Sequence, residues 1–162
     1  MSDFNRIYKS ILTEGRIPSI FKKATPEEVA ERAVQYEKIQ MDEWMNDFLK
    51  RTDIRKNKDG SWDVDGDVVF LGMKAMTRFP VSFGKITDGS FDCGYCTSLT
   101  TLEGAPTTID DGSFYCNGCI SLTTLEYAPK MVGRHFYCWG CGKTFTVEEV
   151  RRHCNVKGEI YV

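Results

Sequence analysis

Residues Gly89-Ser-Phe-Asp-Cys-Gly-Tyr-Cys96 form a motif that the chain repeats as Gly112-Ser-Phe-Tyr-Cys-Asn-Gly-Cys119 and as Arg134-His-Phe-Tyr-Cys-Trp-Gly-Cys141. The first cysteines of the three copies, Cys93, Cys116 and Cys138, lie 23 and 22 residues apart. Shorter copies flank them, Asp67-Val-Val-Phe70 before and Glu159-Ile-Tyr-Val162 after. A single unit of this kind cannot bury its apolar residues, whereas stacked units can. The period therefore predicts a solenoid with one strand from each copy.

The pattern inside each unit predicts which side chains face the core. Phe91 and Cys93 are two residues apart, so a strand directs both to one face and Asp92 to the other. The later leucines and the Ala-Pro turn of the first two units fit the leucine-rich-repeat template, whose period is about 20–29 residues, whereas the third unit departs from it after Cys141. Three further cysteines stand where that template has Asn or Cys, a position that meets backbone groups of the inner turn: Cys96, Cys119 and Cys141.

The segments on either side of the repeats are expected to cap the solenoid. A helix is predicted to begin after Ser2, and Thr25-Pro-Glu-Glu28 has the residues of a capping box at the start of a second helix. A second capping box, Thr146 with Glu149, predicts a short helix from Val147 to about His153. The predicted fold class is α+β. A helical N-terminal segment (1–52) precedes a short leucine-rich-repeat-like solenoid (53–162) with a parallel sheet of about five strands.

Composition excludes several classes of protein. The chain has 162 residues and a formal net charge of −2, so it lacks the basic field of a dedicated nucleic-acid binder. It contains no run of 18 apolar residues and no secretory signal at its start, so we expect neither a membrane span nor export. Seven cysteines in such a chain are expected to be reduced thiols in a cytosol.

The cysteine pairs raise the question of a metal. Cys93-x-x-Cys96 and Cys116-x-x-Cys119 match the spacing of a four-cysteine zinc site. A third pair has the same register, however. In the two flanking copies, the position of the first cysteine is occupied by an apolar residue, Phe70 or Val162. Free cysteine also serves as a small hydrophobic side chain. We therefore expect no metal and no cofactor, with a zinc-binding module as the alternative.

Catalytic signatures are absent from the sequence. Its two histidines, His135 and His153, belong to no recognisable nucleophile–base motif. The glycines punctuate turns between units rather than forming a phosphate-binding loop. The chain is predicted not to be an enzyme.

Residues that alternate with the core positions suggest a binding surface. The repeat places Val69, Asp92, Tyr115, Tyr137 and Tyr161 side by side on the outer face of the sheet, and Tyr and Trp are favoured anchors of interfaces. The alternative is that these rings pack on one another or beneath the N-terminal helices. The predicted partner-binding residues are Asp92, Tyr115, Tyr137, Trp139, Tyr161 and His135.

Two whole units carry a resemblance to a known family: Phe91-Asp-Cys-Gly-Tyr-Cys-Thr-Ser-Leu-Thr-Thr-Leu-Glu-Gly-Ala-Pro106 and Phe114-Tyr-Cys-Asn-Gly-Cys-Ile-Ser-Leu-Thr-Thr-Leu-Glu-Tyr-Ala-Pro129. With the entry Asp59-Gly-Ser-Trp-Asp-Val-Asp-Gly-Asp-Val68 and the closing Val156-Lys-Gly-Glu-Ile-Tyr-Val162, they resemble leucine-rich-repeat-like proteins of tailed bacteriophages, over about residues 59–162. The resemblance implies a phage protein in the cytoplasm of an infected host cell. It is compatible with an accessory role in which the chain binds a host protein, for instance of a defence system, or a phage protein. A structural or assembly component is the alternative, and a nucleic-acid role ranks lower because the strands carry few basic residues.

Overall fold

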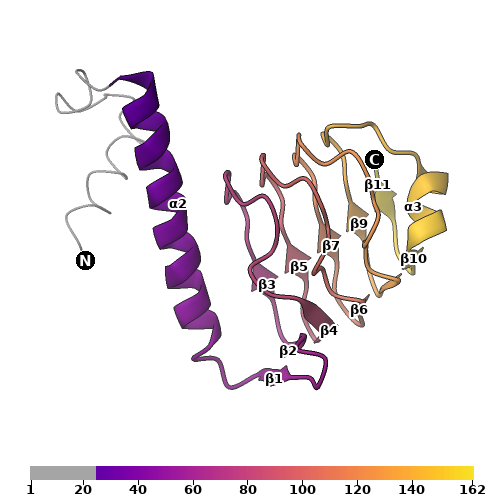
Figure 1. The fold of residues 1–162 in the computed structure, drawn as a ribbon. Coiled ribbons are helices and arrows are strands. Elements are labelled where there is room, and N and C mark those ends of the chain that lie inside the picture. Colours follow the sequence, from indigo (N-terminus) through magenta and orange to yellow (C-terminus); the bar gives the residue numbers. More distant parts are fainter. Residues whose placement is uncertain (1–24) are drawn as a thin grey trace, which may run out of the picture. The chain divides into compact units, whose positions relative to one another are not determined.

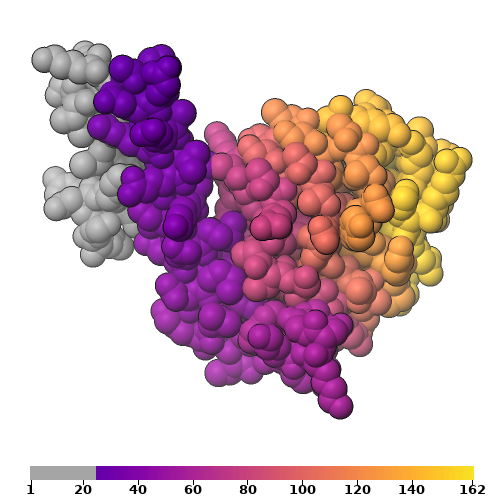
Figure 2. Space-filling model, in the orientation of Figure 1, coloured from indigo at the N-terminus to yellow at the C-terminus, as the bar shows by residue number. Residues whose placement is uncertain are grey.

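The computed structural model describes residues 25–162 and shows a helix followed by a β-solenoid. The chain divides into two compact units, and the boundary between Lys38 and Ile39 falls inside the long helix. The predicted helix that begins after Ser2 lies outside the described residues. The predicted solenoid is confirmed, and its successive turns form the adjacent bands of colour from magenta to yellow in Figure 2.

Helix α2 (Pro26–Phe48) begins where its sequence signals place it. The Glu28 N–H donates to Oγ1 of Thr25 at 3.2 Å, and the Thr25 N–H donates to the Glu28 carboxylate at 2.8 Å. This reciprocal pair satisfies two backbone donors that the helix leaves without a partner, so the predicted capping box is confirmed.

One sheet of the solenoid contains the five strands that the repeat predicts. The strands β3 (Val68–Val69), β5 (Phe91–Asp92), β7 (Phe114–Tyr115), β9 (Phe136–Tyr137) and β11 (Ile160–Tyr161) are parallel and in register. Figure 1 shows them side by side along the solenoid. We call this five-stranded sheet the front sheet.

A second sheet lies on the other side of each turn, and the expectation of a single sheet was incomplete. This back sheet has six strands. Its short parallel strands contain β-branched or apolar residues such as Thr108-Ile109 and Val132, which favour extended backbone. The fold is therefore a β-solenoid with a strand on both sides of the turn. The back strands are β1 (Ile54–Lys56), β2 (Trp62–Asp65), β4 (Phe83–Thr87), β6 (Thr108–Ile109), β8 (Met131–Val132) and β10 (Asn155–Val156), of which β1 is antiparallel.

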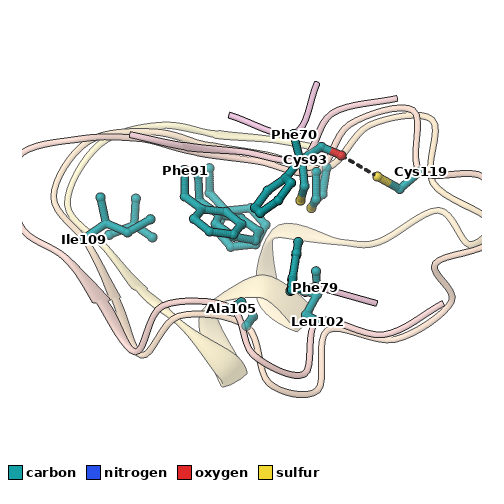
Figure 3. Packing of buried hydrophobic residues seen from close by; sticks show 14 of the residues in the cluster. Phe70, Phe79, Phe91, Cys93, Leu102, Ala105, Ile109 and Cys119 are labelled. Atoms are coloured by element: carbon teal, nitrogen blue, oxygen red, sulfur yellow. Dashed lines mark hydrogen bonds between the residues drawn. The ribbon is translucent and has the colours of Figure 1, made fainter. Parts of the chain in front are cut away.

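Stacked columns of identical or similar side chains make the core between the sheets. Phe91 and Phe114 stack at 5.8 Å between ring centroids, and Phe114 lies 5.1 Å from Phe136. All three rings are fully buried, as are Ile86 and Ile109 on the opposite wall. Figure 3 shows Phe91 among the stacked rings, with Cys93 on one side of them and Ile109 on the other. Each turn thus completes the core of its neighbours, as expected of a repeat.

The last residues of α2 cover the first turn of the solenoid. The indole of Trp44 stacks on Phe70 with ring centroids 4.3 Å apart, and on Phe48 at 5.0 Å. Its Nε1–H donates to the Val69 carbonyl at 3.0 Å, which satisfies a backbone acceptor at the edge of the front sheet. At the other end, α3 (Val147–His153) has the predicted capping box between Thr146 and Glu149.

Candidate functional site: the aromatic face of the front sheet

Three tyrosines stack in a row on the outer face of the front sheet. The ring centroids of Tyr115 and Tyr137 are 4.6 Å apart and those of Tyr137 and Tyr161 are 4.5 Å apart. The rings are nearly parallel, with interplanar angles of 6° and 3°. This tyrosine ladder follows from the register, since parallel strands lie about 4.8 Å apart and place equivalent side chains one above the other. Val69 and Asp92 occupy the same row in the two preceding strands, as the repeat predicts.

The tyrosine ladder is both packed and accessible. The two faces of Tyr137 are covered by its neighbours, which realises part of the packing alternative. Tyr161 is nevertheless 43% exposed, and Tyr115 and Tyr137 are only partly buried. Partial burial, and then the neighbouring phenols, raise the pKa of Tyr137. The raised pKa keeps the Tyr137 phenol, in the middle of the ladder, in its neutral form.

A second aromatic pair lies beside the tyrosine ladder. The rings of Tyr95 and Trp139 meet edge to face at 5.9 Å, and the two residues are 46% and 44% exposed. Tyr95 has φ +57°, whereas its equivalents Gly72, Gly118 and Gly140 have φ of +73°, +70° and +69°. A side chain in this left-handed region costs about 1 kcal/mol or more and often marks a functional position. The outer-face residues predicted from the sequence did not include Tyr95. The signal that could have identified it is a tyrosine at a position where the other units have glycine.

We define the aromatic face as the tyrosine ladder together with Val69, Leu71, Tyr95 and Trp139. Val69 and Leu71 add exposed aliphatic surface at the first strand of the front sheet. The row that contains Leu71 continues through Gly94 and Asn117 to Trp139. The predicted residues Tyr115, Tyr137, Trp139 and Tyr161 therefore belong to one surface, and their role in binding remains a prediction.

A chain of side-chain acceptors runs along one flank of this face. Each side chain accepts a hydrogen bond from the backbone N–H at the equivalent position of the following turn, so that the turns are linked in one direction. We call this series the acceptor ladder. Its four bonds are Ser90 N–H to Asp67 Oδ1 (2.7 Å), Ser113 N–H to Ser90 Oγ (3.0 Å), His135 N–H to Ser113 Oγ (3.2 Å) and Glu159 N–H to His135 Nδ1 (3.0 Å).

The acceptor ladder assigns His135 a structural contact. Because Nδ1 accepts the backbone N–H of Glu159, this nitrogen is not available to a partner. The imidazole lies 5.9 Å from the ring of Tyr161 and 6.1 Å from that of Tyr137. His135 thus supports the edge of the aromatic face, and a direct role in binding stays a prediction.

Asp92 occupies the position of the row immediately before Tyr115. Its Oδ1 accepts the Gly94 N–H at 2.8 Å. Burial raises the pKa of this carboxyl, the Gly94 N–H lowers it in part, and the nearby charge of Asp67 raises it again. Among the described residues no basic side chain forms an ion pair with Asp92. A half-buried carboxylate without a cation therefore lies next to the aromatic face, in the same row as the tyrosine ladder.

The cysteine thiols are hydrogen-bond donors to the backbone of neighbouring turns. The Sγ–H groups of Cys96, Cys119 and Cys141 donate to carbonyls of the preceding turn at 3.1–3.2 Å. The bond from Cys119 to the Cys93 carbonyl is drawn in Figure 3. These bonds fulfil the backbone contact that the repeat template predicts at this position.

Thiol protonation bears on the zinc alternative. Burial raises the pKa of Cys96 to about 12, and burial raises those of Cys93 and Cys116 as well. Zinc binds thiolates, so these environments oppose the required deprotonation. Within residues 25–162, no three His, Cys, Asp or Glu side chains are placed to hold a metal ion together. The spacing of the pairs Cys93/Cys96 and Cys116/Cys119 also matches the period of the core, and the expectation that they hold no metal stays a prediction.

No helix among the described residues combines the length and the apolar character that a membrane crossing requires.

Searches against protein-family models, curated proteins and solved structures give no match to this chain.

Proposed function

We propose that this chain is a non-catalytic protein-binding module and that the aromatic face contacts its partner. The observation that supports the proposal most strongly is the tyrosine ladder beside the Tyr95–Trp139 pair. Large aromatic side chains lose little conformational entropy on binding and dominate the energetics of many interfaces. Here they are held in place by the sheet before any partner arrives, which lowers the cost of ordering them.

Strain at Tyr95 supports the same surface. The other units show that glycine satisfies the backbone at this position, with φ values near +70°. A tyrosine at the same position carries the conformational cost, although its ring lies over Gly118 and meets Trp139 edge to face. Contact with a partner would supply the further stabilisation.

The resemblance to repeat proteins of tailed phages supports the biological setting of the proposal. In that setting the chain acts in the cytoplasm of an infected bacterium and binds a host protein, such as a component of a defence system, or a phage protein. The chemistry of the described residues favours binding over catalysis. His135 uses Nδ1 in a backbone hydrogen bond, and most of the cysteines are buried thiols rather than exposed thiolates.

The proposal is tested with variants that copy residues from neighbouring units. Tyr95→Gly and Trp139→Asn reproduce the residues at the equivalent positions of the central unit, Gly118 and Asn117, and should preserve the fold. The wild type and the double variant are used as baits in infected cells, the captured proteins are quantified by mass spectrometry, and the purified partner is titrated by calorimetry. The double variant is expected to bind at least about tenfold more weakly, since interface anchors contribute about 2 kcal/mol each.

The matched control is Tyr127→Gly. Tyr127 is also an exposed tyrosine with positive φ, at +65°, and its equivalent in the preceding unit is Gly104. It lines a groove over the back sheet with Lys85 and Thr107, away from the aromatic face. Equal weakening by Tyr127→Gly, or unchanged binding of the double variant, would place the partner elsewhere.

A further inference from the structure

We propose that the aromatic face accommodates an arginine side chain of the protein partner, in a slot formed by Asp92, Tyr115, Gly94, Asn117 and Leu71. This inference rests on the proposed function and specifies the chemistry of the partner. The guanidinium lies against the ring of Tyr115 and pairs with the carboxylate of Asp92. The slot below denotes these five residues.

The tyrosine ladder ends at Tyr115, which leaves one face of this ring without a stacking partner among the described residues. Tyr137 has a ring on each side, whereas within the described residues Tyr115 stacks only on Tyr137. Asp92, with a much smaller side chain, occupies the next position of the row. The strand spacing of about 4.8 Å is close to the stacking distance of the ladder. A planar group at the level of Asp92 would therefore stack on Tyr115 as the tyrosines stack on one another.

Two hydrogen-bond acceptors, from Asp92 and Asn117, converge over Gly94. A Cβ built on Gly94 would lie 3.1 Å from Oδ1 of Asp92, 3.4 Å from Oδ1 of Asn117 and 3.4 Å from Cδ1 of Leu71. These distances are at or below ordinary van der Waals contact, so the two oxygen atoms and the methyl group close over the Gly94 backbone, and a ligand would meet them from their outer side. A guanidinium has five N–H donors in one plane and an apolar stem, which match two acceptors at the base and a leucine at the rim.

The charged side chains around the slot favour a cation. The front-sheet rows that carry the acceptor ladder and the tyrosine ladder contain Asp67, Asp92 and Glu159 and no Lys or Arg. The nearby Arg51 is engaged with the Asp53 carboxylate and the Asp67 carbonyl, and Arg134 lies at the corner before His135. A carboxylate without a cation and the negative faces of aromatic rings attract a cation and repel phosphate. These features favour a cationic protein segment over a nucleic acid.

Arginine fits the slot better than lysine for a geometric reason. Its guanidinium is planar and can stack on Tyr115 while two N–H groups point at the Asp92 carboxylate. A lysine ammonium is compact and strongly hydrated, so it would gain the charge interaction without the stacking. The discrimination between the two side chains is therefore part of the proposal.

The test is an NMR titration of the full-length ¹⁵N-labelled chain with the blocked pentapeptide Gly-Gly-Arg-Gly-Gly. The amide of Gly94 reports directly, because it donates to Asp92 Oδ1. We expect saturable shifts at Gly94, Tyr115 and Asn117. The citrulline peptide, which is neutral and nearly isosteric, should bind at least about tenfold more weakly, and the lysine peptide should bind severalfold more weakly.

Two variants complete the test. Asp92→Asn should weaken binding of the arginine peptide at least about tenfold, whereas Glu103→Gln, which removes the charge of an exposed carboxylate on a different part of the turn, should leave it unchanged. Equal binding of the arginine and citrulline peptides, equal binding of the lysine peptide, full binding by Asp92→Asn or shifts confined to other parts of the chain would each overturn the assignment. Tighter binding of an oligothymidylate at the same amides would overturn it in favour of a nucleic acid.

The capture assay separates the two proposals. If Asp92→Asn retains the cellular partner while Tyr95→Gly with Trp139→Asn loses it, the aromatic face is the binding surface and the arginine assignment fails. If the pentapeptide binds as expected but the partner binds elsewhere, the slot recognises arginine and the proposed function fails.

Discussion

Replacing Phe114 by Ala tests the assignment of the two faces of the front sheet. Phe114 is fully buried in the middle of the phenylalanine column, with Phe91 on one side and Phe136 on the other. Both neighbours are held by their own turns, so the space left by the ring cannot close easily. Truncation of a buried Phe costs about 3–5 kcal/mol in such sites. That loss is about a fifth or more of a typical free energy of unfolding, which is about 5–15 kcal/mol.

The measurement is urea unfolding followed by far-ultraviolet circular dichroism, with a thermal scan as a second readout. At about 4 °C per kcal/mol for a domain of this size, the midpoint should fall by about 12–20 °C. Tyr115→Ala is the control, because Tyr115 is the next residue and points to the opposite face. It loses one stacking contact and should cost about 0.5–1.5 kcal/mol. Similar midpoints for the two variants would show that the faces are assigned in reverse.

Two further predictions concern the corners and the thiols. Gly112→Ala should destabilise the chain by at least about 2 kcal/mol more than Gly72→Ala in urea unfolding, because the added Cβ would clash with the carbonyl oxygen of Gly89 in the preceding turn. Gly72, at φ +73°, has open space around it, so equal costs for the two variants would refute this close packing. Burial raises the pKa of Cys96, Cys138 and Cys154 from 9.0 to about 12, so the folded state retains protons that the unfolded state has lost. Stability should therefore be complete below pH 9 and should fall between about pH 9 and 12, by about 1.4 kcal/mol per pH unit for each thiol, and a urea midpoint that stays constant up to pH 11 would contradict it.

The front sheet could be predicted because strands β3, β5, β7 and β9 each begin a triplet in which two buried residues flank one more exposed residue, although the equivalent Val162 after β11 is itself 44% exposed. Phe91 and Cys93 flank Asp92, and the same triplet recurs in each unit, so that both the faces and the register follow from the period. The caps could be predicted for a different reason, since a capping box is a local pattern that depends on four residues alone.

The back sheet was harder to predict because its strands are short and show little alternation. Strands β6, β8 and β10 each bury one apolar residue, Ile109, Val132 and Val156. A single apolar residue in a turn-rich segment does not distinguish a strand from a loop. Only the recurrence of a buried residue at intervals of about 23 residues indicates these strands. The recurrence can be recognised as a sheet once each turn is known to have a strand on both sides.

The candidate site was predicted where it depends on register and missed where it depends on backbone conformation. The row from Asp92 to Tyr161 follows from alternation along the strands. The left-handed conformation of Tyr95 cannot be inferred from hydrophobicity, because it is a property of the turn. The acceptor ladder was also missed, since Asp, Ser and His share no side-chain class except the ability to accept a hydrogen bond.

The acceptor ladder has a consequence for how proteins of this type can change in length. Each of its side chains serves the turn that follows, and Ser90 and Ser113 are interchangeable in that role. A duplicated turn inserted between them would therefore find a partner for its own backbone donor and would supply one to the next turn. The terminal caps would keep their contacts with the first and last turns. Gene duplication can thus lengthen the tyrosine ladder by whole turns. The number of repeat units in the gene then sets the length of the aromatic surface.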